Sequence, residues 1–73
     1  FYNKALNINK TLENKESLAF NYLSIGVIYA HKKELNRALG NYNHSLKLAK
    51  EISCSELIAH NLQNIGEIYL QNN

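Results

Sequence analysis

The stretch NYLSIGVIYA (residues 21–30) has the apolar spacing of a helix, yet Gly26 lies at its centre. Forty residues later, the stretch NLQNIGEIYL (residues 61–70) has Gly66 at the same place. A glycine inside a helix costs about 1 kcal/mol relative to alanine. A residue that weakens a helix twice at the same place indicates a repeated structural unit in which the glycine has a packing role.

The repeat extends over the whole chain when the sequence is aligned with itself at an offset of 40 residues. Residues 1–33 then pair with residues 41–73 without a gap, and 11 of these 33 pairs are identical. The central identical pairs are Asn21/Asn61, Ile25/Ile65, Gly26/Gly66, Ile28/Ile68 and Tyr29/Tyr69. One-third identity at a single ungapped offset is a strong signal of internal repetition.

Each unit has the periodicity of two helices. Tyr22, Ile25, Gly26 and Tyr29 have the spacing i, i+3, i+4 and i+7, which places them on one helical face. The pattern predicts helices over residues 1–12, 15–31, 35–52 and 54–71, joined by short turns. Two helices in every 40 residues predict an α-solenoid, in which each antiparallel helix pair stacks on the next.

Two helix starts have capping residues. Ser53 precedes Glu56 by three positions, which is the capping-box pattern. Glu13 or Asn14 has the equivalent place before residues 15–31. We therefore expect the chain to turn near residues 13–14 and again near residue 53.

Close packing is the expected reason for the repeated glycine. Without a Cβ atom at Gly26, a facing helix can approach the backbone, and an aromatic ring such as that of Tyr42 can lie against it. We expect the shared Ile, Gly and Tyr residues to face the second helix of their own unit. A kink at Gly26 is the alternative.

These residues resemble the tetratricopeptide repeat (TPR) family. The first helix of that motif has a bulky residue, Leu-Gly and Tyr, and the second has Ala, an aromatic residue and a small residue. The matching residues here are Tyr22, Ile25, Gly26 and Tyr29, then Leu35, Ala38, Tyr42 and Ser45, then Leu62, Ile65, Gly66 and Tyr69. The unit is similar to the long variety of the repeat, because it has 40 residues instead of the usual 34. The customary glycine between the two helices is replaced by Lys33 and Glu34.

The resemblance implies an all-α fold, a right-handed α-solenoid of antiparallel helix hairpins with about four helices. Residues 1–13 would be the second helix of a truncated repeat, residues 14–53 a full repeat, and residues 54–73 the first helix of the next repeat.

The resemblance also implies a function, because first-helix residues of this family line a concave, peptide-binding face. Carried onto this chain, the face consists of Phe20, Leu23, Ser24, Val27, His31, His60, Gln63, Asn64 and Glu67. Phe20, Leu23 and Val27 form an apolar stripe by their spacing, which predicts either a groove for a peptide or helix or a surface that a preceding helix covers.

Other function classes have little support in the composition. The net charge is +2, too weak to indicate nucleic-acid or membrane binding. The three histidines lack the i, i+3 or i+4 spacing of metal ligands on a helix, so we expect no metal or other cofactor. No nucleophile, base and phosphate-loop combination is present, so we expect no enzyme activity.

The sequence therefore predicts a protein–protein interaction scaffold that binds a peptide or helical segment on its concave face. The alternative is a peptide-sensing or dimerisation segment of a bacterial regulator or sensor kinase. The expected partners are a protein or peptide, with self-association or neighbouring repeats of a longer chain also open. One cysteine and no long apolar run favour a cytoplasmic location.

Overall fold

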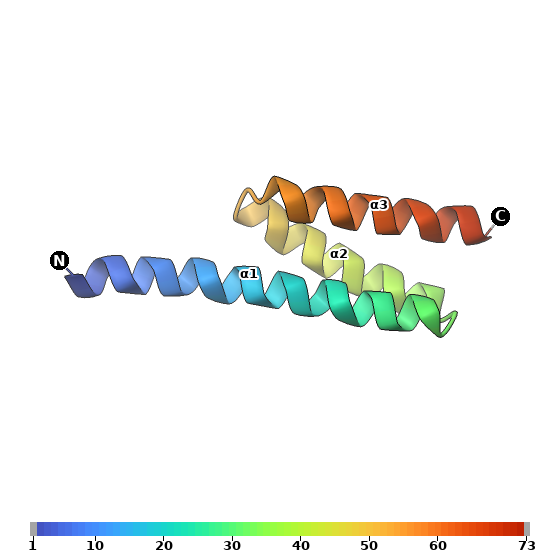
Figure 1. Cartoon of the computed structure of the whole chain (residues 1–73), viewed down its shortest axis with the longest axis horizontal. Helices are drawn as coiled ribbons and strands as arrows, with labels where there is room; N and C mark the ends of the chain where they lie inside the picture. Colours follow the sequence, from blue (N-terminus) through green and yellow to red (C-terminus); the bar gives the residue numbers. More distant parts are fainter. Residues whose placement is uncertain (1, 73) are drawn as a thin grey trace.

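The computed structural model describes the backbone of residues 2–72 and the side chains of residues 14–71. Over this range the chain forms three helices and no strand: α1 (Tyr2–His31), α2 (Leu35–Glu51) and α3 (Ser55–Asn72). Helix α2 runs back along α1, and α3 then runs beside α2 in the direction of α1 (Figure 1). The predicted all-α fold is confirmed for the described residues.

The count of about four helices is wrong, because the predicted helices at residues 1–12 and 15–31 form one continuous helix, α1. The expected turn at Glu13 and Asn14 is absent. The stretch LENKE at residues 12–16 consists mostly of strong helix formers, whereas the aligned stretch at residues 52–56 is ISCSE. The chain therefore turns at the second place and stays helical at the first. The side-chain packing expected of residues 1–13 lies outside the described side chains.

The two turns of the structure have the same hydrogen-bond pattern. At the end of α1, Glu34 N–H donates to the Tyr29 carbonyl (2.9 Å) and Lys33 N–H to the Ala30 carbonyl (3.1 Å). At the end of α2, Cys54 N–H donates to the Ala49 carbonyl (2.9 Å) and Ser53 N–H to the Lys50 carbonyl (3.1 Å). These paired bonds are the Schellman motif, which satisfies the last carbonyls of a helix.

Each motif needs one residue in the left-handed region, here Lys33 (φ 67°) and Ser53 (φ 54°). Ser53 therefore ends α2 and is not the cap of α3, as the capping-box pattern had predicted. The residue before α3 is Cys54, whose carbonyl accepts the Ile58 N–H (3.0 Å).

The core consists of two small clusters, each with residues from all three helices. The first contains Ala19, Ala49 and Leu57, and the second contains Ala38, Tyr42 and Ile68, with Val27 and Ala30 of α1 packed against it. Three of these six buried residues are alanines, so the helix backbones approach closely. Leu23 packs against both clusters and joins them.

The contact between α1 and α2 is closest at Gly26. A Cβ atom added to Gly26 would lie 2.6 Å from Cε1 and 2.7 Å from Cδ1 of Tyr42, and 3.3 Å from the Ala38 carbonyl oxygen. The structure thus places the Tyr42 ring directly on the α1 backbone. At Gly66, in contrast, an added Cβ atom would have no described neighbour within 4 Å.

A buried hydrogen-bond chain joins the three helices near their middle. The Ser45 hydroxyl of α2 donates to the Ala19 carbonyl of α1 (2.7 Å) and accepts from Nδ2 of Asn61 of α3 (2.8 Å). The same Nδ2 also donates to the Leu57 carbonyl (2.9 Å). Ser45 and Asn61 are fully buried, and their bonds offset the loss of hydration.

The shared isoleucines do not face the helix that follows them, as the repeat pattern had suggested. Ile25 and Ile28 are 40% and 54% exposed on α1, whereas the aligned Ile65 and Ile68 of α3 pack against the cluster that contains Ala38 and Tyr42 of α2. Glycine therefore faces the following helix, and isoleucine faces the preceding one.

The two glycines give opposite predictions for the same substitution. Gly26→Ala should lower the free energy of unfolding by about 1–2 kcal/mol, because the methyl group overlaps a buried ring that has no free space. Gly66→Ala should raise it by about 0.5–1 kcal/mol, because the site is open and alanine favours the helix. Thermal unfolding followed by circular dichroism measures both. Equal shifts in melting temperature would contradict the packing account.

Candidate functional site

A groove lies where the C-terminal parts of α1 and α3 meet the N-terminal part of α2. Its volume is about 200 Å³. We call it the three-helix groove, and it is lined by Val27, Ala30, His31, Lys33, Tyr42, Asn64, Glu67 and Gln71. A groove with cationic, anionic and amide side chains can hydrogen-bond the backbone and the polar side chains of a peptide.

Four of the nine residues predicted for the concave face line this groove: Val27, His31, Asn64 and Glu67. Two pairs of lining residues are separated by 40 positions, Val27 with Glu67 and His31 with Gln71. The same two positions of both units thus contribute to one hollow. The members of each pair differ in chemistry, unlike the residues that pack between helices.

The other five predicted residues lie outside the groove. Phe20 is 49% exposed, and Ser24, His60 and Gln63 are also exposed. Leu23 is partly buried between the two core clusters, and Val27 also packs against the core. Phe20, Leu23 and Val27 therefore do not form one exposed apolar stripe, because core residues of α2 and α3 pack against two of the three.

The phenol of Tyr42 is the most perturbed acid of the groove. Burial raises the pKa of Tyr42 above its ordinary value of 10.0, and the negative charge of Glu67 raises it further. The hydroxyl group therefore keeps its proton at neutral pH. Because the neutral form is favoured in the folded state, this contribution to stability is complete below about pH 10 and is lost as the pH rises beyond it.

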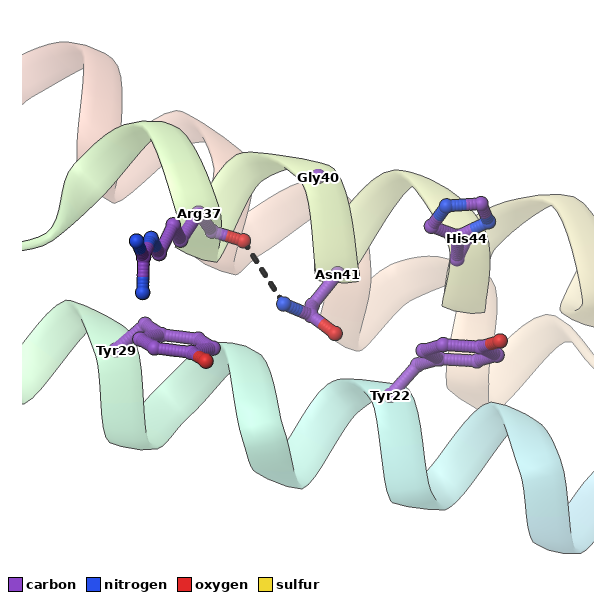
Figure 2. Close-up of a pocket in the computed structure, with 6 residues that line it drawn as sticks. All are labelled: Tyr22, Tyr29, Arg37, Gly40, Asn41 and His44. Atoms are coloured by element: carbon purple, nitrogen blue, oxygen red, sulfur yellow. Dashed lines mark hydrogen bonds between the residues drawn. The ribbon is translucent and has the colours of Figure 1, made fainter.

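A second, larger hollow of about 410 Å³ lies on another side of the α1–α2 contact. Figure 2 shows its lining: Tyr22, Tyr29, Arg37, Gly40, Asn41 and His44. The Tyr22 and His44 rings are stacked with centroids 5.1 Å apart. The Arg37 guanidinium lies 5.8 Å from the centroid of Tyr29. These two contacts hold α2 to α1 at either end of the hollow, beside Gly26.

Sequence reasoning missed Arg37, Gly40, Asn41 and His44 as residues of a common surface. Gly40 was the available signal, since it lies in the middle of a helix and outside the 33 aligned pairs. An added Cβ atom at Gly40 would meet no described atom within 4 Å, so this glycine allows no close approach and leaves the hollow open.

Metal and membrane sites have no support within the described residues. No group of three His, Cys or Glu side chains among them could hold a metal ion. In the same part of the chain, no helix combines the length and the hydropathy needed to cross a membrane.

The placement of Leu23 and Phe20 gives a direct test of which predicted site residue belongs to the core. Leu23→Ala should lower the free energy of unfolding by about 2 kcal/mol, because it removes the side chain that joins both clusters. Phe20→Ala should lower it by less than about 1 kcal/mol, because half of the ring is in solvent. Chemical denaturation measures both values. A larger effect at Phe20 than at Leu23 would contradict this placement.

Comparison of the chain with protein-family models, with curated proteins and with solved structures gives no significant match.

Proposed function

We propose that this chain is a protein-interaction scaffold of the tetratricopeptide type, which binds a peptide or helical segment in the three-helix groove. The helices α1 and α2 would form one antiparallel hairpin of a right-handed solenoid, and α3 would begin the next. The motif residues Tyr22, Gly26, Ala38 and Tyr42 support this assignment through their contacts.

The observation that carries the proposal is the pairing of groove residues at the repeat offset. In a solenoid, the same position of consecutive repeats lines one continuous surface, so a ligand contacts several repeats at once. Val27/Glu67 and His31/Gln71 fit this rule. Their difference in chemistry gives the surface one apolar side and one polar side, which suits a ligand with a defined direction.

The groove favours a particular kind of peptide. Glu67 on α3 gives a negative charge, and His31 and Lys33 at the end of α1 give donors and positive charge. Asn64 and Gln71 can each donate to and accept from a peptide bond. An extended peptide with a basic residue toward α3 and an acidic residue toward the α1–α2 turn would match these charges.

The test is a selection of binders from a random peptide library against the 73-residue chain, followed by affinity measurement by fluorescence anisotropy. Glu67→Lys should weaken the selected peptides by about tenfold or more, since it reverses the only carboxylate of the groove. Asn64→Ala should also weaken them.

Glu16→Lys is the matched control, because it makes the same charge change at an exposed position of α1 outside the groove. It should leave the affinity within about twofold. The proposal fails if no peptide is selected, or if the selected peptides bind all three variants as well as the original chain.

A further inference from the structure

An apolar stripe on α1 has no covering element among the described residues. Leu18, Ile25 and Ile28 are 47%, 40% and 54% exposed, and Asn21 beside them is also exposed. The positions 18, 21, 25 and 28 have the spacing of one helical face. We call this set the α1 stripe. None of its residues lines the three-helix groove.

The repeat shows what this kind of face does. The aligned residues of α3 are Ile58, Asn61, Ile65 and Ile68, and three of the four are identical to those of the α1 stripe. In α3 these residues form the contact with α2: Asn61 and Ile68 are 0% and 1% exposed, and Ile58 and Ile65 pack against the core. The same side chains are therefore covered in one unit and exposed in the other.

The covering helix, α2, has a defined surface chemistry at this contact. Ala38 and Tyr42 cluster with Ile68, and Ala49 clusters with Leu57. Between them, the Ser45 hydroxyl accepts a hydrogen bond from the Asn61 side chain at 2.8 Å. Small residues allow a close approach, and the hydroxyl satisfies the amide that the contact buries.

A second copy of the chain cannot supply this surface. Ser45 and Ala49 are both 0% exposed, because α2 lies between α1 and α3 of its own copy. Residues 2–13 align with residues 42–53, but they have Ala5 in place of Ser45 and so lack the hydroxyl. The occupant must therefore be a helix from outside the folded copy.

We propose that the α1 stripe binds an amphipathic helix of a partner protein that has the surface pattern of α2. The partner helix has a small residue, an aromatic residue four positions later, a serine or threonine three positions after that, and a second small residue four positions further on. The Asn21 amide donates to the partner's hydroxyl, as Asn61 does to Ser45. This surface is separate from the three-helix groove, so the two proposals are independent.

The probe is a fluorescently labelled, end-capped peptide with the sequence of α2, LNRALGNYNHSLKLAKE (residues 35–51). Titration with the 73-residue chain, followed by anisotropy, should give saturable binding. Ile28→Lys should weaken this binding by about tenfold or more, because a charge would be buried in the contact. Leu62→Lys is the matched control, since Leu62 of α3 is 53% exposed and lies off the stripe; it should leave the affinity unchanged.

The hydrogen bond has its own test, in which the chain keeps its apolar stripe. Asn21→Ala in the chain and Ser45→Ala in the probe should each weaken binding by roughly fivefold to tenfold. Their combination should be no weaker than either one alone, because both remove the same bond. Circular dichroism of each chain variant controls for folding.

Three results would overturn the proposal. The first is a probe that does not bind, and the second is binding that Leu62→Lys weakens and Ile28→Lys does not. The third is a dimer of the chain alone, detected by sedimentation and dissociated by Ile28→Lys, because a second copy would then cover the stripe.

Discussion

The contact of the Tyr42 ring with the backbone at Gly26 sets the distance between α1 and α2, and the other features of the structure depend on that distance. An added Cβ atom at Gly26 would lie 2.6 Å from the ring, so only glycine permits this spacing. The same ring clusters with Ile68 of α3 and lines the three-helix groove. One aromatic side chain thus contributes to the α1–α2 contact, to the packing of α3 and to the candidate binding surface.

The helices that begin each unit use two faces for two different neighbours. On α1, the glycine face is covered by α2 and the isoleucine face is exposed; on α3, the isoleucine face is covered by α2 and the glycine face is exposed. Both faces are shared at the repeat offset because each is a helix-packing surface. The groove positions differ between the units, because no helix of the described structure has to fit against them.

Much of the fold follows from the sequence. The repeat of glycine, isoleucine and tyrosine predicts helices α2 and α3 to within one residue at each end, and it predicts Tyr42 as the ring that meets Gly26. The break at residues 13–14 was not predictable by alignment, since LENKE and ISCSE occupy equivalent positions but differ in helix propensity. Periodicity shows that a residue is on an apolar face, but it cannot show which neighbour covers that face. Leu23 and Ile25 were therefore assigned to the wrong environments, and the hollow at Gly40 was missed.

The most direct test of the central contact is the energetic coupling between Gly26 and Tyr42. The free energy of unfolding is measured for Gly26→Ala in the original chain and in a Tyr42→Leu background, where a shorter and more flexible side chain can move away from the methyl group. The account predicts that Gly26→Ala is destabilising beside tyrosine and that at least half of this penalty disappears beside leucine. The same penalty in both backgrounds would show that Gly26 is required for a reason other than the Tyr42 ring.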